Sequence, residues 1–493
     1  MSIVSFSANR VIPVDPHESL ADYIDAGGGD GLRAARLVDR EVVIAEVEAS
    51  GLRGRGGAGF PTGTKWRTVV SYESAMLSTA VVVNAAEGEP GTWKDRAILL
   101  SNPYAVLEGA LIGASVVGAR TITVATKQRF VDVVHRLKGA IEEIRVAGWL
   151  DDPHVGEVSV EIFEGPEEYL YGEETALLEV LDGRQPFPRI APPWRRGVIE
   201  VVRTPGDVES ASGLSADVEM AVQADDNAPP PVLVDNVETL ANIPAIVARG
   251  ATWFRSAGTT ESPGTIVCTV TGAVARPAVI EVPMGTSLRS VIELATQGAD
   301  QSVLCVLMGV SNPILLPGDL DVALTYEAMR ERGSGLGSAS FIVIDAETHP
   351  AALAAGVSRF LAVESCGQCT ACKQDGLQIS TLLRGIVDGH GEPDHIDRIA
   401  ARVATVADGA RCSLATQHQA VIGSIIRAFG DPIRDLADGG GPPVATYLVA
   451  ELTGLADGLA SVDETFADKQ PDWTHAATDS GQAPAERLDE HRV

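Results

Sequence analysis

Hydrophobic and polar residues along the first half of the chain follow two alternating patterns. Short β-branched runs of strand type alternate with stretches in which apolar residues recur every three or four positions, as in an amphipathic helix. The runs predict strands at 79–84, 119–126 and 158–163, and the periodic stretches predict helices at 39–50, 103–119, 129–148 and 234–250. The stretch 169–183 is predicted to be a loop that opens a helix, which ends at Gly183. This order of strands and helices indicates a parallel α/β sheet that ends near residue 255.

The second half of the chain has a different pattern of hydrophobic and polar residues. From about residue 263, two strand-like runs, a turn, a helix and a further strand resemble a small β-grasp unit, and the periodicity from 347 to 430 is helical. A polar stretch at 203–232 ends in prolines and is expected to be a surface excursion. We expect five segments: an N-terminal extension (1–40), an α/β domain (41–255), a β-grasp domain (260–345), a helical domain (347–435) and an acidic C-terminal tail (436–493).

Composition and charge exclude several classes of protein. A chain of 493 residues with 45% hydrophobic and 21% charged residues is an ordinary globular protein with more than one core. Its net charge of −29 argues against nucleic acid and anionic membrane surfaces as partners, because both attract Lys/Arg clusters. The N-terminus lacks a secretory signal pattern, and the longest apolar stretch, 103–119, is shorter than the roughly 20 residues of a membrane span. We therefore expect a cytoplasmic protein without direct membrane insertion.

Four of the six cysteines form the strongest chemical signal. The stretch "ESCGQCTAC" places Cys366, Cys369 and Cys372 in a C-x-x-C-x-x-C pattern, and Cys412 follows in "GARCSLAT". Three closely spaced thiolates and a distant fourth are the ligand pattern of one [4Fe–4S] cluster, whereas a zinc site usually presents two separated pairs. A zinc knuckle or a set of structural cysteines is the alternative. The other two cysteines lie in apolar strand contexts and are expected to be core thiols: Cys268 and Cys305.

A glycine-rich stretch, "GLRGRGGAGFPTGTKW" at 51–66, indicates a phosphate site. Gly54, Gly56 and Gly59 fit the spacing G-x-G-x-x-G, but the stretch follows a helix-like segment and not the strand that a Rossmann fingerprint requires. It is not a P-loop either, because the lysine of a P-loop directly follows a glycine, whereas a threonine precedes Lys65. The glycines still let backbone N–H groups approach a phosphate, to which Lys65 adds a positive charge.

Several motifs fit one family together. In chain order they are "GLRGRGGAGFPTGTKW", "NAAEGEPGTWKDR", "GEETALLEVLDGR", "DNVETLANIP" and "ESCGQCTAC…C". They resemble the NADH-binding flavoprotein subunit (the F subunit) of bacterial respiratory complex I, a module that also occurs in NAD-reducing hydrogenases and NAD-dependent formate dehydrogenases. The resemblance covers roughly residues 45–430. It implies FMN, NADH and one [4Fe–4S] cluster, held by a Rossmann-like FMN/NADH domain, a β-grasp (SLBB-like) domain and a C-terminal helical bundle.

The resemblance also implies which residues contact the cofactors. Around the flavin and its phosphate it implies Gly54, Arg55, Gly56, Gly57, Lys65, Asn84, Glu87, Gly88, Tyr169, Gly172, Glu173, Asp235, Asn236 and Thr239. Phe60 and Trp194 match aromatics at the dinucleotide, and Glu89 matches a carboxylate that binds a ribose hydroxyl, which favours NAD(H). Glu174 is the one residue assigned to catalysis, because a carboxylate beside the flavin ring disfavours the added negative charge of reduced flavin. The four clustered cysteines are the iron ligands.

Taken alone, each of these residues has a plainer interpretation. Glu173 and Glu174 would be carboxylates at a helix N-terminus, where they interact favourably with the helix dipole. Phe60 and Trp194 would be core or surface aromatics, and Lys65 would be a solvated lysine. It is the joint occurrence of the motifs that favours the cofactor-binding interpretation.

The chain departs from the family at four positions. Ala86 stands where the family usually has an Asp, and Asp235 replaces an Asn near the phosphate. Ala191 replaces a Lys, whose charge one of the two arginines at 195–196 is expected to supply, and Thr68 replaces an aromatic. These differences leave the expected chemistry intact but weaken the assignment to complex I itself.

The resemblance implies an electron-input subunit of a multi-subunit NAD(H)-linked oxidoreductase. Hydride transfer between NADH and FMN would be followed by single-electron transfer to the cluster, and reversed flow would reduce NAD⁺ at the same site. Because the chain has no second cysteine quartet, electrons must pass to partners, expected to be a small [2Fe–2S] thioredoxin-like subunit and a larger iron–sulfur or catalytic subunit. The parent complex is expected to be of the formate dehydrogenase/hydrogenase type or complex I, which would place the chain at the membrane periphery. A non-catalytic, metal-stabilised scaffold subunit is the alternative.

Overall fold

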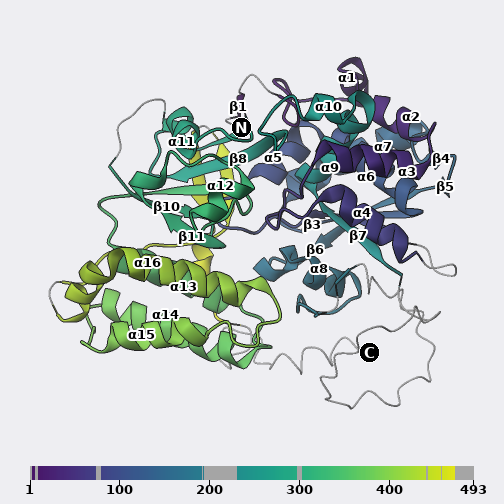
Figure 1. The fold of residues 1–493 in the computed structure, drawn as a ribbon. Coiled ribbons are helices and arrows are strands. Elements are labelled where there is room, and N and C mark those ends of the chain that lie inside the picture. The colour runs from purple at the N-terminus through teal and green to yellow at the C-terminus, as the bar shows by residue number, and fades with distance from the viewer. Residues whose placement is uncertain are drawn as a thin grey trace, which may run out of the picture.

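The computed structural model describes most of the chain. The described residues are 3–5, 9–73, 79–190, 192–193, 230–296, 302–439, 442–456 and 458–471. Trp194, Ala191 and the arginines at 195–196 lie outside them, as does the predicted surface excursion up to residue 229. Figure 1 shows an α/β part on the right, a second sheet on the left and a helical bundle below it.

A four-stranded parallel sheet forms the centre of the α/β part. Its strands, in spatial order, are β6 (Ser159–Gly165), β3 (Thr121–Lys127), β2 (Ala80–Ala85) and β7 (Val232–Asn236). The predicted alternation of strands and helices is confirmed for β2, β3 and β6. The sequence pattern did not separate β7 from the helix expected at 234–250, because this short strand continues into α9 (Val237–Arg249) without a loop.

Helices cover both faces of this sheet. One face of the sheet packs on a hydrophobic core that includes side chains of α6 and α9, and we call it the first core. The other face of the sheet packs on α8. The helices of this part are α3 (Arg40–Ser50), α4 (Thr62–Ser71), α5 (Lys94–Ser101), α6 (Pro103–Val117), α7 (Val131–Val146), α8 (Glu174–Leu181), α9 (Val237–Arg249) and α10 (Ala251–Phe254). A 3₁₀ helix, η1 (Tyr169–Gly172), precedes α8, and a two-stranded ribbon of β4 (Asp151–Asp152) and β5 (Gly156–Glu157) follows α7.

The first 40 residues, expected as an extension, are packed into the α/β part. They contain the short helices α1 (Leu20–Asp25) and α2 (Asp30–Ala35), whose apolar side chains belong to the first core. Hydrogen bonds to Glu108, a buried residue of the apolar helix α6, help to hold these N-terminal helices in place. Tyr23 donates its hydroxyl to Glu108 at 2.7 Å, and the N–H groups of Gly29 and Leu32 donate at 2.8 Å. The N-terminal residues therefore satisfy a carboxylate that α6 alone would leave without partners.

None of the helices in the part of the chain that the structure describes is by itself both long and apolar enough to cross a membrane. By length and composition, α5 (Lys94–Ser101) and α6 (Pro103–Val117) would be sufficient only as a pair, and they meet at a bend of 97°.

The second sheet is the expected β-grasp unit. Its six strands, in spatial order, are β1 (Ile3–Ser5), β9 (Ala278–Pro283), β8 (Thr265–Gly272), β12 (Ser340–Asp345), β10 (Val303–Met308) and β11 (Asn312–Leu315). Helices α11 (Leu288–Thr296) and α12 (Tyr326–Glu331) and the 3₁₀ helix η2 (Pro317–Asp319) connect the strands. The N-terminal strand β1 pairs in parallel with β9, so the chain's N-terminus belongs to this sheet although the next helices belong to the α/β part.

A buried carboxylate fastens the N-terminal segment to this sheet. Glu281, in β9, accepts hydrogen bonds from the backbone N–H groups of Arg10, Val11 and Ile12, at 2.9 Å for the last of these. Thr265 donates its hydroxyl to the same carboxylate at 2.6 Å. Burial raises the pKa of Glu281 to about 7, although its donors act in the opposite direction.

This pKa predicts a pH-dependent stability. A carboxyl group whose pKa is higher in the folded than in the unfolded protein contributes stability below the unfolded pKa of 4.5, and the contribution is lost as the pH rises through about 7. Between pH 5 and pH 8 the free energy of unfolding should therefore fall by roughly 2–3 kcal/mol more in the natural chain than in a Glu281→Gln variant. Urea unfolding of both proteins at the two pH values measures the difference, and equal pH dependence would contradict the prediction.

Four helices form the C-terminal bundle, as the periodicity predicted. They are α13 (Pro350–Val363), α14 (Thr370–Val387), α15 (His395–Thr405) and α16 (Ser413–Ala437). Their apolar faces share one core with β10 and β11 of the second sheet. In α16 the helical geometry is interrupted at Phe429, three residues before Pro432, where a proline cannot continue the hydrogen-bond ladder.

The segment after the bundle is structured although its composition is that of an acidic tail. We call residues 444–456 and 458–471 the C-terminal strap. It contains a hairpin of β13 (Leu452–Ala456) and β14 (Leu459–Val462) and the 3₁₀ helix η3 (Glu464–Ala467). Leu455 belongs to the first core, whereas Val449 and Phe466 belong to the core of the bundle. The strap therefore connects the α/β part and the bundle, and residues 472–493 lie outside the described residues.

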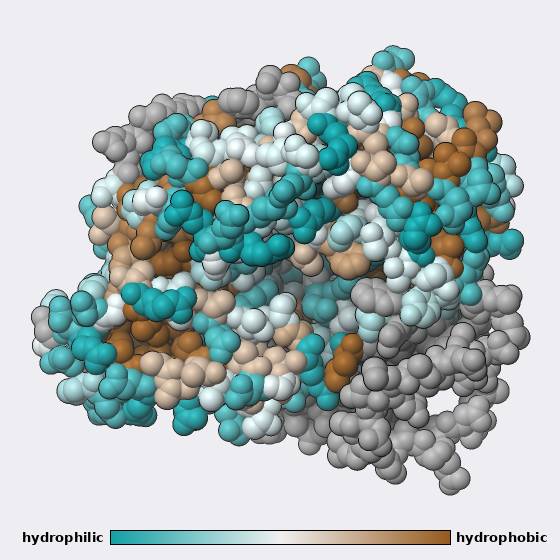
Figure 2. Space-filling view, viewed as in Figure 1, coloured by the Kyte–Doolittle hydropathy of each residue, from teal (hydrophilic) through white to brown (hydrophobic). Residues whose placement is uncertain are grey.

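On the face shown in Figure 2, hydrophobic residues are scattered among hydrophilic ones and form no single large patch. Large apolar side chains are nevertheless exposed near α2 and α3, where Leu37 is 85% and Val42 54% exposed. Single exposed apolar residues of this kind are common on globular proteins and need no partner.

Candidate functional site

Polar side chains collect at the carboxyl edge of the parallel sheet. Asn84 lies near the end of β2, and Asn236 is the last residue of β7, directly beside it in the ladder. Asn84 donates to the carbonyl of Gly172 at 2.9 Å, which draws η1 over this edge. Ligands of parallel α/β sheets bind at this edge, in the crevice outside the strand ends.

The glycine stretch forms a loop between two helices above Asn236. It begins after α3 and ends at α4, so the prediction that it is not a Rossmann fingerprint is confirmed. Gly54 donates its N–H to the carbonyl of Phe60 at 2.8 Å and closes the loop. A Cβ atom on Gly56 would lie 3.3 Å from the Cβ of Asn236, so the loop packs closely on the strand end, and a larger residue would need a small shift there.

The loop wraps around Tyr326, from α12 of the second sheet. The Tyr326 hydroxyl donates to the carbonyl of Gly54 at 3.1 Å, and the guanidinium of Arg53 lies over its ring. Gly59 has a φ of +63°, and a Cβ there would overlap the ring of Tyr326. The loop conformation thus depends on the packing of the second sheet against the α/β part.

Replacing Gly59 by alanine should destabilise the protein by about 1–3 kcal/mol, because the backbone conformation becomes strained and the new methyl group collides with Tyr326. Gly139→Ala is the matched control: this glycine lies inside α7 with open space around it, and the change should stabilise the chain by about 0.5–1 kcal/mol. Urea unfolding of the two variants measures both effects, and a Gly59→Ala variant as stable as the natural chain would contradict this account.

Lys65 lies where α4 meets the sheet edge, between two carboxylates. It forms an ion pair with Glu174, at the start of α8, and its Nζ lies 3.6 Å from Oδ1 of Asp235. Asp235 also accepts the indole N–H of Trp66 at 2.8 Å. Burial acts to lower the pKa of Lys65, but the two carboxylates outweigh it and raise this pKa. Lys65 is therefore a permanent cation, held in place by Asp235, which departs from the family's usual asparagine.

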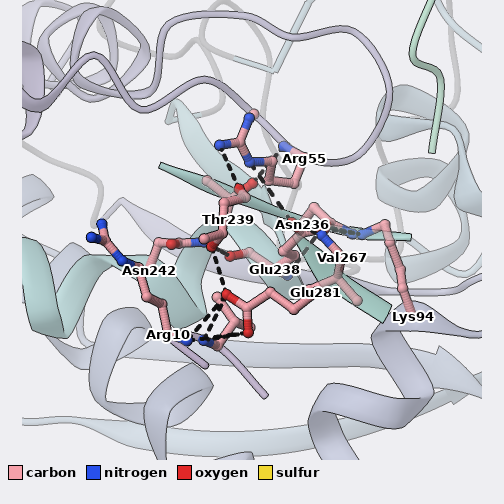
Figure 3. A network of polar contacts seen from close by, with 12 residues as sticks. Arg10, Arg55, Lys94, Asn236, Glu238, Thr239, Asn242, Val267 and Glu281 are labelled. Atoms are coloured by element: carbon pink, nitrogen blue, oxygen red, sulfur yellow. Dashed lines mark hydrogen bonds and ion pairs between the residues drawn. The ribbon is translucent and has the colours of Figure 1, made fainter. Parts of the chain in front are cut away.

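A buried network of charges lies beneath the glycine loop, and Figure 3 shows Glu238 of α9 between Arg55 and Lys94. Lys94 Nζ lies 3.1 Å from Glu238, 2.7 Å from Asp95 and 3.0 Å from the side-chain oxygen of Asn236. Charge-paired and hydrogen-bonded in this way, the ammonium can be buried. The network fixes the orientation of Asn236, a predicted cofactor contact.

The side chain of Arg55 joins the same network and is turned toward the second sheet. Its guanidinium donates to the hydroxyl of Tyr326 at 2.9 Å and to the carbonyl of Thr265 at 3.0 Å, and its Nε lies 3.8 Å from Glu238. Its backbone N–H donates to the hydroxyl of Thr239 at 2.9 Å. The backbone of Arg55 therefore lies at the site, whereas its guanidinium group links the glycine loop to the second sheet.

The two carboxylates of the "EGE" motif have separate protein partners. Glu87 is buried and accepts from Arg96 at 2.7 Å and from the N–H of Asp95 at 2.9 Å. Glu89 accepts from the hydroxyl of Tyr169 at 2.5 Å and from the N–H of Val310 at 2.7 Å. Burial raises the pKa of both carboxyl groups. Glu89 thus lies at a junction of the α/β part, η1 and the second sheet.

The 3₁₀ helix η1 forms a wall between the sheet edge and the bundle. A Cβ on Gly172 would lie 2.8 Å from the carbonyl oxygen of Ala86, so η1 lies against the turn that follows β2. Glu173 caps α8, accepting the N–H groups of Thr175 and Ala176 at 3.0 and 2.8 Å. Its capping role, the plainer interpretation of this residue, leaves its second carboxylate oxygen for other contacts.

Of the remaining positions, the structure describes Phe60, Thr68 and Ala86. Phe60, in the glycine loop, is 45% exposed. Thr68 is half-buried on α4 and donates its hydroxyl to the carbonyl of Thr64 in its own helix, and Ala86 is buried directly after β2. Trp194 lies outside the described residues, so its predicted contact stays a prediction.

All four clustered cysteines line one small cavity at the end of the bundle nearest η1. Cys369 is the N-cap of α14, and Cys412 is the N-cap of α16. Cys366 lies in the loop before α14, and Cys372 lies in the first turn of that helix. Leu170 of η1 lines the same cavity. Helix N-termini carry a partial positive charge, which stabilises an anionic thiolate cluster placed between them.

The surroundings of the thiols suit metal ligands. Burial raises the pKa of Cys366, that of Cys372 to about 11 and that of Cys412 to about 12, so these thiols ionise readily only with a metal to compensate. Gln368 and Ser365 lie 3.3 Å from the Sγ atoms of Cys366 and Cys372, within reach of hydrogen bonds to sulfur. The predicted quartet is thus brought together at one point.

The sheet edge suits a phosphate group. Lys65 supplies a cation, and the N-terminus of α9 lies beside the glycine loop, because Thr239 in its first turn accepts the N–H of Arg55. Within the described part of the chain, no protein acceptor meets the N–H groups of Gly56 and Gly57. These groups are therefore available to a bound phosphate.

Sequence reasoning missed the buried cations of this site. Lys94 and Arg96 lie in the quoted motif "TWKDR", and Lys127 ends β3, yet none of them was selected as a candidate. All three are almost completely buried. The signal was the run of three charged residues in "WKDR" next to apolar segments, since such a run is costly to bury unless its charges are paired.

Comparison with protein families finds three matching models along the chain. Residues 47–245 match the Nuo51 FMN-binding domain, and residues 267–302 match the SLBB domain. Residues 352–436 match the iron–sulfur binding region of NADH-ubiquinone oxidoreductase F. The three models follow the order of the α/β part, the second sheet and the bundle.

Relatives of known name cover most of the chain. The NADH-quinone oxidoreductase F 2 subunit of Rhizobium meliloti (strain 1021) is 35% identical over 409 residues, which are 81% of this chain and 90% of the relative. The NADH-quinone oxidoreductase F subunit of Rhodobacter capsulatus is 33% identical over 425 residues, 85% of this chain and 92% of the relative. Among solved structures, an NAD⁺-reducing [NiFe]-hydrogenase in its H₂-reduced state matches with a TM-score of 0.71 and 29% identity, over 85% of this chain and 67% of that chain.

Proposed function

The chain belongs to the family of NADH-quinone oxidoreductase F subunits, and from this membership we propose the residues that perform its electron transfer. As a member of this family it is an NADH-oxidising electron-input subunit with FMN and one [4Fe–4S] cluster. The observation that carries the assignment of residues is the position of η1. Gly172 meets the sheet edge through Asn84, and Leu170 lines the cysteine cavity, so both sites share one wall.

We assign the flavin to the sheet edge. The glycine loop and Lys65 would bind its phosphate through N–H groups and a permanent positive charge. Asn84, Asn236 and Thr239 would contact the phosphate and ribose side, with Asn236 oriented by Lys94. Glu174 and Glu173 would lie toward the ring, where the negative charge of Glu174, partly balanced by Lys65, tunes the ease of reduction.

NADH would bind on the outer side of the same site. The accessible ring of Phe60 would stack on the dinucleotide, together with Trp194. Glu89 would bind a ribose hydroxyl, which requires its hydrogen bond from Tyr169 to be shared or exchanged. These side chains bind and orient NADH, and none of them needs to transfer a proton.

When bound, the flavin converts the two-electron chemistry of NADH into the one-electron chemistry of the cluster. The chain's contribution is to hold the cluster with Cys366, Cys369, Cys372 and Cys412, at the wall that η1 forms. Electrons would then pass to partner subunits, which we expect to be a small [2Fe–2S] thioredoxin-like subunit and a larger iron–sulfur or catalytic subunit. A parent complex of the formate dehydrogenase/hydrogenase type and complex I are both compatible with this role, in either direction of electron flow and on the cytoplasmic side.

One spectroscopic experiment tests this proposal. Protein purified without oxygen should contain about one FMN and about four iron atoms per chain, and NADH should bleach its flavin absorbance. Protein that binds zinc in place of iron and holds no flavin would instead be the metal-stabilised scaffold, and the proposal would be wrong. Isolation of the native complex and identification of its largest subunit would name the parent complex.

A further inference from the structure

Lys127 is a fully buried cation beneath the cofactor loops. It is the last residue of β3, at the carboxyl edge of the sheet, and its side chain has no exposure to solvent. Its Nζ donates to the carbonyl of Glu167 at 3.0 Å, two residues before Tyr169. A Cβ added to Gly88 would lie 2.9 Å from Nζ, so the backbone of the loop after β2 packs directly on the ammonium group.

The counter-ion of Lys127 comes from the far end of the chain. Glu451, in the C-terminal strap, lies 2.7 Å from Nζ and is itself buried. Glu451 also pairs with Arg129, which has further partners in Glu167 at 2.7 Å and in Asp463 of the strap at 3.0 Å. Two cations at and just after the end of β3, Lys127 and Arg129, are thus neutralised partly by the strap.

The strap reaches the predicted flavin site at a second point. The carbonyl of Leu452 accepts from Arg96 at 2.7 Å, and the same guanidinium holds Glu87 at 2.7 Å. Because Glu87 and Gly88 are neighbours, this contact and the one through Lys127 act on the same loop.

A third contact leads to η1. Lys469 pairs with Glu364 at 2.6 Å, and the other oxygen of Glu364 accepts the N–H of Tyr169 at 2.9 Å. Phe466 packs on Phe360 with ring centroids 5.0 Å apart, and Phe360 meets the ring of Tyr169 edge-on at 5.3 Å. The strap thus supports both walls of the site from behind, although it contributes no residue to the site itself.

We propose that Glu451 is a positioning residue for the flavin site, which as the counter-ion of Lys127 holds the Gly88 loop and the start of η1 in place and balances the positive charge beneath them. This inference rests on the proposed function. It assigns a role to a segment that has no counterpart among the cofactor motifs of the sequence. The strap is accordingly required for flavin binding even though it does not touch the cofactor.

If Glu451 acts through its charge, substitutions of Glu451 and of Lys127 should shift the flavin midpoint potential in opposite directions, which a merely structural role would not do. Glu451→Gln removes a negative charge and leaves Lys127 uncompensated, so reduced flavin, which carries the extra negative charge, is favoured and the flavin midpoint potential shifts in the positive direction. Lys127→Met removes the cation and leaves the carboxylate, so the potential shifts in the negative direction. The double variant lacks both charges, and its potential should return toward that of the natural chain.

The experiment uses the full-length chain, stripped of flavin and titrated with FMN by fluorescence, followed by spectroelectrochemical titration of the loaded protein. Glu451→Gln should raise the dissociation constant for FMN about tenfold, because one partner of a buried ion pair is lost. Glu464→Gln, a change of the same chemistry at an exposed position of the strap, should leave both the dissociation constant and the potential unchanged.

The outcomes separate this inference from the proposed function. A natural chain that fails to bind FMN would overturn the proposed function, whereas a natural chain that binds FMN with a Glu451→Gln variant of equal affinity and potential would overturn only the inference. Shifts of the potential in the same direction in both single variants would overturn it as well. If Glu451→Gln does not fold, the comparison of Lys127→Met with the double variant decides, since equal potentials in these two would refute the role of Glu451.

Discussion

Replacing Cys412 by serine is expected to abolish assembly of the iron–sulfur cluster while leaving flavin binding intact. Cys412 is the N-cap of α16 and the only one of the four thiols outside the short run before and within α14. Serine keeps the size of the side chain but offers iron a poorer ligand than a thiolate. Iron content should fall from about four atoms per chain to well below one, and the low-temperature electron paramagnetic resonance signal of the reduced cluster should disappear.

The same variant separates the two redox sites. NADH should still bleach the flavin, because the sheet edge contains no cysteine of the quartet, but no electron would appear on a cluster. Cys305→Ser is the matched control, since Cys305 is a buried thiol of β10 that does not line the cavity of the quartet. Full iron content in Cys412→Ser, or loss of iron in the control, would contradict the assignment of the ligands.

Replacing Lys65 by methionine is expected to weaken FMN binding by roughly 100-fold or more. The change removes the cation assigned to the phosphate and leaves the carboxylates of Glu174 and Asp235 facing it without compensation. Removal of one partner from a buried ion pair costs about 3–5 kcal/mol, and each 1.4 kcal/mol corresponds to a factor of ten in affinity. Fluorescence titration of the flavin-free chain measures the loss.

Two further variants test whether the loss of FMN affinity comes from the position of the Lys65 charge or from the total charge of the chain. Lys65→Arg keeps the charge and should retain most of the affinity, although the larger guanidinium fits the position less well. Arg67→Ala removes a cation from the exposed side of the same helix, where Arg67 pairs with Glu41 and Glu48, and it should leave FMN binding unchanged. Equal losses in Lys65→Met and Arg67→Ala would show that general charge, and not the position of Lys65, governs binding.

Local sequence patterns were sufficient to predict many of the strands and helices of this fold. The strands β2, β3 and β6 and the helices of the bundle follow from periodicity, because each has a clear apolar face or a β-branched run. The cysteine quartet follows from spacing, since three thiolates two residues apart converge at the start of one helix. The glycine loop was correctly separated from a Rossmann fingerprint by the helix that precedes it.

The features that the sequence did not predict depend on contacts between distant residues. In the sequence, Glu108 interrupts an otherwise apolar helix. The structure shows that the hydroxyl of Tyr23 and the N–H of Gly29 donate hydrogen bonds to its carboxylate. Lys94 and Lys127 read as ordinary solvated lysines, because nothing near Lys127 in the sequence indicates that Glu451 will cover it. Burial of a charge is a property of its partners, and here the partners come from other parts of the chain.

The direction of a side chain is equally hard to read from a motif. Arg55 lies inside the glycine loop, where a positive charge near phosphate is the natural expectation, yet its guanidinium binds Tyr326 and the carbonyl of Thr265. The departure at Asp235 shows the reverse case. From sequence alone, a carboxylate near the expected phosphate is unfavourable, but Lys65 and the indole N–H of Trp66 hold it in the structure.

The position of the C-terminal strap also sets the order of events during synthesis. A ribosome releases Glu451 only after the α/β part, the second sheet and the bundle have emerged, so a nascent chain contains Lys127 and Arg129 without their distant counter-ion. The loop at Gly88 therefore acquires its final support only after the strap has emerged. A chain cut short before the strap would bury Lys127 without its counter-ion, which favours degradation of the chain over its assembly.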